Sequence, residues 1–154
     1  PFIISYPSVV KPGVCTYPVI STDFYPTLLE LAGLPLQKKQ HLDGVSLLPL
    51  LKDNKSTINR DALYWHYPHY SNQGGFPGGA IRSGSFKLVE RYENGKASLY
   101  DLKEDPGERR DLAEKMPDRV KALRPKLHEW YREVGAKFLT VKGNSGEPWH
   151  PPGS

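Results

Sequence analysis

The sequence is poor in cysteine and contains no long hydrophobic run. Cys15 is the single cysteine, so the chain cannot form an internal disulfide, and a disulfide-stapled scaffold is excluded. No apolar stretch approaches the roughly 18–20 residues that a membrane-spanning helix needs, and nothing resembles a signal peptide. The composition is therefore typical of a globular domain without a membrane span. A chain of 154 residues is long enough to bury a sizeable core.

The charge distribution lacks any strongly basic or acidic run. The formal net charge is +4, which suits an anionic substrate. However, basic and acidic residues alternate, as in the stretch 104–111, and no nucleic-acid-binding motif is present. We therefore expect no nucleic-acid partner.

The first 60 residues predict a short strand and two helices. Residues 2–5 resemble a buried strand. Ser21-Thr22-Asp23 offers N-cap side chains for a helix that runs to about Ala32, with Pro26 tolerated in its first turn. A shorter helix is expected over 46–52, followed by a polar connector. Because the chain starts without Met and inside a strand pattern, we expect a C-terminal segment of a longer protein.

From Ala62 onwards the pattern changes to short β-runs. Strands are predicted over 63–67, 80–82, 86–89 and 97–100, which together make a small antiparallel four-stranded sheet. Ser83-Gly84 suits a tight hairpin. Asn94-Gly95 predicts a second hairpin with a type I′ turn, which requires positive φ at both central residues.

A C-terminal helix is predicted from about Pro117. Its apolar residues recur every three or four positions, so one face is expected to pack on the sheet; these residues are Val120, Leu123, Leu127, Trp130, Tyr131 and Val134. Pro125 lies inside the run and predicts a kink, because it removes a backbone donor. Residues 138–154 show no periodicity and are expected to form an irregular tail.

Three stretches carry a resemblance to a known family. They are Pro1-Phe2-Ile3-Ile4-Ser5 with Ser21-Thr22-Asp23-Phe24-Tyr25-Pro26-Thr27-Leu28-Leu29-Glu30-Leu31-Ala32-Gly33, then Leu42-Asp43-Gly44-Val45-Ser46-Leu47-Leu48-Pro49, and finally Ala80-Ile81-Arg82-Ser83-Gly84 through Leu99-Tyr100-Asp101-Leu102 to Glu104-Asp105-Pro106-Gly107-Glu108. In this order they resemble the C-terminal part of type I, formylglycine-dependent sulfatases. These arylsulfatase-like enzymes belong to the alkaline-phosphatase superfamily.

The resemblance implies an α/β fold in two parts. Residues 1–52 would supply the last strand and helices of the large catalytic domain. Residues 62–135 would form the C-terminal subdomain, an antiparallel four-stranded sheet packed by a helix. This division agrees with the strands and helices predicted from the residues alone.

Neither a nucleophile nor a metal site is recognisable. Sulfatases of this type use a formylglycine and a divalent cation, calcium being the expected one, and the resemblance implies both for the intact enzyme. Cys15 lacks the family's motif, since its context is Cys15-Thr16-Tyr17-Pro18-Val19 with no Arg. The aspartates lie among turn signals and are expected to form turns and caps; they are Asp43, Asp53, Asp61, Asp101, Asp105 and Asp111. We therefore assign no catalytic residue and no metal ligand.

The candidate substrate contacts are His66 and His69. They precede a Gly-rich loop that ends near Gly79, and in sulfatases the small subdomain borders the active-site cleft. Imidazole can donate to a sulfate oxygen or a sugar hydroxyl. The alternatives are that His66 is satisfied within the sheet and that His69 is simply solvent-exposed. For Arg82, a structural salt bridge is favoured over pairing with sulfate.

Three functions are compatible with these observations. The leading interpretation is the C-terminal portion of a sulfuric ester hydrolase, inactive alone, whose partner is an N-terminal catalytic portion and whose substrate is a sulfated small molecule or sugar. The second is a fragment of a related phosphomonoester or phosphonate hydrolase. The third is a stand-alone binding module that uses the aromatic loop. A periplasmic, secreted or lysosomal parent protein is compatible with each.

Overall fold

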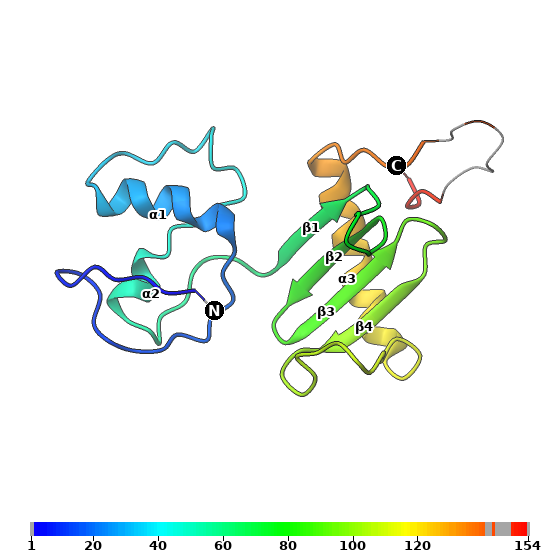
Figure 1. Ribbon diagram of the computed structural model, residues 1–154, viewed down its shortest axis with the longest axis horizontal. Helices are drawn as coiled ribbons and strands as arrows, with labels where there is room; N and C mark the ends of the chain where they lie inside the picture. The colour runs from blue at the N-terminus through cyan, green and yellow to red at the C-terminus, as the bar shows by residue number, and fades with distance from the viewer. Residues whose placement is uncertain (1, 141–142, 144–148, 154) are drawn as a thin grey trace. The chain divides into compact units, whose positions relative to one another are not determined.

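The computed structural model describes residues 2–140, 143 and 149–153. The chain divides into two compact units, Pro1–Arg60 and Asp61–Ser154, and both are drawn in Figure 1. None of the described helices is both long enough and apolar enough to cross a bilayer. The two units are described separately below.

The first unit contains a 3₁₀ turn and two helices. The turn η1 (Ser21–Asp23) leads directly into α1 (Phe24–Leu31), and α2 (Leu48–Lys52) follows. The two helices predicted from the sequence are thereby confirmed, although helical geometry begins at Ser21. α1 ends at Leu31 with Ala32 as its C-cap, and the next residue, Gly33, adopts a φ of 69°, the left-handed conformation common after helices.

The strand predicted over residues 2–5 is wrong. These residues form neither helix nor strand, and the Ile3 side chain is 87 % exposed. The described residues of the first unit include no strand at all, so residues 2–5 have no neighbouring strand to supply hydrogen-bond partners. The apolar pattern alone was therefore not sufficient to form a strand in this chain.

A buried ion pair organises the first unit. The Asp23 carboxylate is fully buried and accepts hydrogen bonds from the Arg60 guanidinium at 2.7 and 3.0 Å. It also accepts from the backbone N–H groups of Ile20 and Val45. Arg60 donates in addition to the Pro18 carbonyl. One carboxylate thus joins the start of α1 to two segments that are distant in the sequence.

The second unit is built on the predicted four-stranded antiparallel sheet. Its strands lie in the order β1 (Leu63–Tyr67), β2 (Gly78–Ser83), β3 (Phe86–Arg91) and β4 (Ala97–Asp101). Each strand pairs with the next along the chain, so the sheet is a simple meander (Figure 1).

Helix α3 (Pro117–Glu133) covers one face of this sheet (Figure 1). Ile81, Leu88 and Leu99 on the strands form the buried core with residues of α3, among them Leu123 and Leu127. The helix continues through Pro125 without interruption. The prediction of a four-stranded sheet packed by a C-terminal helix is confirmed.

The two hairpin turns differ in detail from the prediction. Ser83 pairs with Phe86, so the first turn consists of Gly84 and Ser85. In the second hairpin Arg91 and Lys96 close a four-residue loop, and only Gly95 has positive φ, at 68°. The predicted type I′ turn is therefore wrong. A longer loop needs just one left-handed residue, which glycine supplies.

The described residues 149–153 of the predicted tail contain no helix or strand. Trp149 nevertheless packs on the edge of the core. Residues 141–142, 144–148 and 154 lie outside the described part of the chain.

Candidate functional site

The loop between β1 and β2 presents His69 to solvent. It is fixed at its end by buried Pro77, whose carbonyl accepts from the Tyr92 N–H at 3.0 Å. Phe76 lies beneath the Arg91 guanidinium, 3.5 Å from carbon to ring centroid. Tyr70 donates to the Glu93 carboxylate at 2.9 Å.

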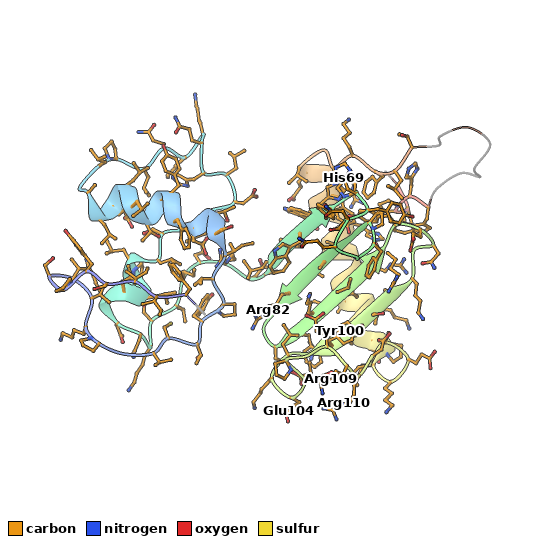
Figure 2. The ribbon with its side chains drawn as sticks, viewed as in Figure 1. His69, Arg82, Tyr100, Glu104, Arg109 and Arg110 are labelled. Carbon is orange, nitrogen blue, oxygen red and sulfur yellow. The ribbon has the colours of Figure 1, made fainter. Side chains whose placement is uncertain are left out.

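Figure 2 shows His69 at the end of the sheet where β1 terminates. Its ring is exposed and makes an edge contact with Tyr67, with ring centroids 5.6 Å apart. An anchored loop that carries an exposed imidazole is suited to contact a polar ligand.

The two ring nitrogens of His66, in contrast, both form hydrogen bonds within the second unit. Its Nε2 lies 2.9 Å from the Lys137 carbonyl and must donate to it, so Nδ1 accepts from the Tyr92 hydroxyl at 2.6 Å. Burial lowers the pKa of His66 below its ordinary value, against the effect of the Lys137 hydrogen bond, while the nearby His69 lowers it further. His66 is therefore neutral at pH 7 and fixed in one tautomer.

Two buried tyrosines extend from His66 into the core. The Tyr92 and Tyr131 side chains are almost fully buried. Burial raises the pKa of both phenols far above the ordinary value, and for Tyr131 the neighbouring Tyr92 hydroxyl raises it further. A Cβ at Gly79 would overlap both hydroxyls. The sheet therefore requires glycine at this point to admit the tyrosine pair.

A second polar cluster is buried between β3 and α3. Glu90 is fully buried and accepts from Arg124 Nε at 2.6 Å, while His128 Nε2 lies 3.0 Å from both of its carboxylate oxygens. Arg124 also donates to the Gly95 carbonyl at 2.7 Å. Arg124 and His128 are four residues apart, so they lie on one face of α3. Their hydrogen bonds to Glu90 and to the Gly95 carbonyl join α3 to β3 and to the second hairpin.

The aspartates expected to form turns largely do so. Asp53 and Asp101 each accept from the backbone N–H two residues ahead. The Asp105 carboxylate accepts hydrogen bonds from the backbone N–H groups of Arg109 and Arg110. The Asp111 carboxylate accepts from the backbone N–H groups of Leu99 and Ala113. Asp61 instead pairs with Lys126 at 3.6 Å.

No metal-binding group is found in the described part of the chain. No cluster of three or more His, Cys, Asp or Glu side chains comes together there, and Cys15 is an exposed thiol. The described side chains therefore do not form a binding site for a divalent cation.

The predicted salt bridge of Arg82 does not form. Arg82 Nε donates to the Gly84 carbonyl at 3.3 Å, and over residues 2–140, 143 and 149–153 no carboxylate lies within ion-pair distance of it. The register places Arg82 opposite Lys87 instead.

Comparison with known proteins identifies the class to which this fold belongs, which is the C-terminal domain of a sulfatase. The chain belongs to the family described as "N-sulphoglucosamine sulphohydrolase, C-terminal", whose model matches residues 1–136. The resemblance noted in the sequence is thereby confirmed.

Individual relatives agree with the family. A "Sulfatase" of Formosa agariphila is 34 % identical over 145 residues, which cover 84 % of this chain and 26 % of the relative. The "Arylsulfatase K" of Homo sapiens is 31 % identical over 172 residues, covering 92 % of this chain and 31 % of the relative. The chain thus spans about a quarter to a third of the length of these two relatives.

Solved structures show the same fold. The structure of BT4656 in complex with its substrate D-glucosamine-2-N,6-O-disulfate matches with a TM-score of 0.62 at 29 % identity, over 73 % of this chain and 24 % of that one. The structure of BT1596, a 2-O GAG sulfatase, matches with a TM-score of 0.65 at 26 % identity, over 85 % of this chain and 30 % of that one.

Family membership settles several of the predictions. The chain is the C-terminal part of a sulfatase, with an α/β fold of the alkaline-phosphatase type. The interpretations as a phosphonate hydrolase fragment or a stand-alone module are not favoured. The family implies a metal and a formylglycine in the intact enzyme.

Sequence reasoning missed both buried polar clusters of the second unit. For Glu90 a signal was present, because strand alternation places it on the same face as Leu88, and the spacing of Arg124 and His128 puts them on one side of α3. The Tyr92–Tyr131 pair gave no comparable signal, since Tyr92 lies just beyond the end of β3.

Proposed function

We propose that the chain completes a sulfuric ester hydrolase that acts on a sulfated sugar, and that it borders the substrate cleft of that enzyme. The observation that carries this proposal is the match of residues 1–136 to a C-terminal sulfatase family. The names of two related proteins support a sulfated sugar as the substrate. One is a "Delta 4,5-hexuronate-2-O-sulfatase" of Bacteroides thetaiotaomicron, 33 % identical over 122 residues, and BT4656 is solved with a sulfated glucosamine.

The proposed partner of this chain is an N-terminal catalytic portion. That portion would carry the formylglycine nucleophile and the divalent cation, for which we propose calcium because hard oxygen ligands are typical of the family's site. The chain's own residues then bind and orient the substrate.

His69 is the proposed direct contact to the sugar or sulfate. It is exposed and lies on an anchored loop, and its ring forms no hydrogen bond with any residue that the structure describes. For His66 the proposal is more limited, because both ring nitrogens already bond to Tyr92 and Lys137. His66 is proposed to hold the end of β1 and so to position the loop that carries His69.

The test compares the 154-residue chain with the full-length protein in which it follows an N-terminal portion. Each is purified and assayed on an aryl sulfate and on a sulfated glucosamine. The full-length protein is expected to release sulfate and to lose this activity with a chelator, whereas the chain alone is expected to release none. Chelator-sensitive hydrolysis by the isolated chain would contradict the proposal, as would a full-length protein that cleaves phosphonate monoesters but no sulfate ester.

A further inference from the structure

The loop between β1 and β2, residues 68–77, is held at its C-terminal end by the second hairpin. The Pro77 carbonyl accepts a hydrogen bond from the Tyr92 N–H at 3.0 Å. The Arg91 guanidinium covers the Phe76 ring, with 3.5 Å between the guanidinium carbon and the ring centroid. A hydrogen bond and a cation–π contact therefore fix the last residues of the loop against β3.

The start of the same loop is also attached to this hairpin. The Tyr70 hydroxyl donates to Glu93 Oε1 at 2.9 Å. This hydrogen bond raises the pKa of the Tyr70 phenol, and desolvation and the charge of Glu93 raise it further, so the phenol remains a donor at neutral pH. Because His69 is the residue before Tyr70, the contact fixes the backbone directly after the exposed imidazole.

Glu93 connects the two points of attachment. One of its carboxylate oxygens accepts from Tyr70, and the other lies 3.8 Å from Nη1 of Arg91, the residue that covers Phe76. The Arg91 and Glu93 side chains are 41 % and 37 % exposed, so their ion pair alone contributes little to stability. Its consequence is geometric, because both ends of the loop are linked to one hairpin.

The hairpin that carries Glu93 is itself fixed to the core of the second unit. Arg124 of α3 donates to the Gly95 carbonyl at 2.7 Å, and the Gly95 N–H donates to the Arg91 carbonyl at 2.8 Å. Tyr92 is fully buried. The hairpin is therefore a firm support for the loop that it holds.

The tip of the loop has no comparable support in the described part of the chain. A Cβ added at Gly74 or Gly75 would meet no atom within 4 Å beyond its chain neighbours. The Gly74 N–H donates to the Ser71 carbonyl at 3.2 Å, which is a contact within the loop. The position of the loop therefore depends on the contacts at its two ends.

We propose that Glu93 is a positioning residue for substrate binding, which holds Tyr70 and so fixes the place of His69 relative to the sulfated sugar. The proposal rests on the proposed function, because that function makes His69 a substrate contact. Glu93 then acts only through His69 and does not touch the substrate. Removing Glu93 or the Tyr70 hydroxyl can therefore cost no more activity than removing the His69 side chain.

A double-mutant cycle in the full-length protein tests this dependence. Tyr70→Phe deletes only the hydroxyl and is expected to lower kcat/KM on a sulfated glucosamine about two- to fivefold, with an unchanged Tm. In a His69→Ala background the same substitution should cause no further loss. A loss that persists there would overturn the proposal, because Tyr70 would then contact the sugar itself. No loss in either background would overturn it as well.

Substitutions at Glu93 separate the hydrogen bond from the charge. Glu93→Ala should lose as much kcat/KM as Tyr70→Phe, whereas Glu93→Gln keeps an acceptor oxygen for Tyr70 and should remain close to the wild type. The matched control is Glu104→Ala, because Glu104 is exposed and lies at the other end of the sheet from His69 (Figure 2). Equal losses in Glu93→Gln and Glu93→Ala, or an equal loss in the control, would contradict the proposed role.

Hydrogen–deuterium exchange of the full-length protein, with millisecond labelling, measures how firmly the loop is held without an activity assay. Residues 69–76 are expected to exchange faster in Glu93→Ala and in Tyr70→Phe than in the wild type, and Glu93→Gln and Glu104→Ala should match the wild type. Unchanged exchange in Glu93→Ala, in an enzyme that releases sulfate, would overturn the proposal alone. Faster exchange in a protein that releases no sulfate would instead contradict the proposed function.

Discussion

The two units of the chain are stabilised in different ways. Among the described residues of the second unit, eight buried hydrophobic side chains form one cluster between the sheet and α3. The described residues of the first unit form a buried cluster of three, Leu47, Leu50 and Ile58, and rely on the fully buried Asp23 carboxylate with Arg60. Several large apolar side chains of the first unit remain exposed, including Ile3, Val14 and Leu28.

This difference indicates which unit is self-sufficient. A layer of helix on sheet with a continuous core is a complete folding unit. The first unit has short helices and exposed apolar surface, which is expected of a segment that completes its core with other residues. We therefore expect the second unit to be the more stable in the isolated chain.

Breaking the buried ion pair should have the largest effect, and it should be confined to the first unit. Arg60→Met leaves the Asp23 carboxylate buried without its cation, which costs about 3–5 kcal/mol. The amide protons of Ile20 and Val45, which donate to Asp23, should lose their protection from hydrogen exchange. If those two amides stay protected while β2 and β3 lose protection, the proposed division into units is wrong.

Opening a cavity in the core of the second unit should have a slightly smaller effect. Leu127 is fully buried between α3 and the sheet, so Leu127→Ala is expected to lower the free energy of unfolding of residues 61–154 by about 2–5 kcal/mol. Chemical denaturation followed by Trp fluorescence measures this change. Ile3→Ala is the control, because an exposed side chain leaves no cavity; a comparable loss there would contradict the account of the core.

The second unit should become more stable as the pH rises towards neutrality. Burial lowers the pKa of His66 in the folded state, so the unfolded chain binds more protons below pH 6.5, the ordinary value. The free energy of unfolding should therefore rise with pH from the lowered pKa up to about 6.5. His66→Asn should flatten this rise in denaturation measured from pH 5 to 7, and an unchanged slope would show that His66 does not contribute.

The smallest expected effect concerns catalysis by the full-length protein. His69→Ala removes one hydrogen bond of about 0.5–1.5 kcal/mol, which is a two- to tenfold loss of kcat/KM on a sulfated sugar. Stability should not change, because His69 is exposed. Leu127→Ala is the matched control and should keep its kcat/KM once folded. An unchanged kcat/KM for His69→Ala would remove His69 from the substrate site.

Most of the second unit could be predicted because its signals are local. Alternation and turn residues marked all four strands, and the three- and four-residue spacing marked α3. The prediction of a type I′ turn was wrong because the dipeptide Asn94-Gly95 is compatible with two loop lengths. Only the pairing of Arg91 with Lys96 decides between them. Loop length depends on register, which a dipeptide does not fix.

The first unit and the site were less predictable because their contacts are non-local. Asp23 and Arg60 are 37 residues apart, and no periodicity connects them. His69 was identified from its loop, and its exposure agrees with the proposed role without testing it. The engagement of His66 by Tyr92 and Lys137 depends on residues 26 and 71 positions away.

A chimera measures most directly whether this chain completes a sulfatase. The matching C-terminal segment of the Formosa agariphila sulfatase is replaced by residues 1–154, and folding is checked by cooperative thermal unfolding before sulfate release is assayed. The two segments are 34 % identical over 145 residues, so we predict that the chimera folds and releases sulfate. This release should stop when the metal is chelated. A chimera that unfolds cooperatively but releases no sulfate would contradict the proposed function.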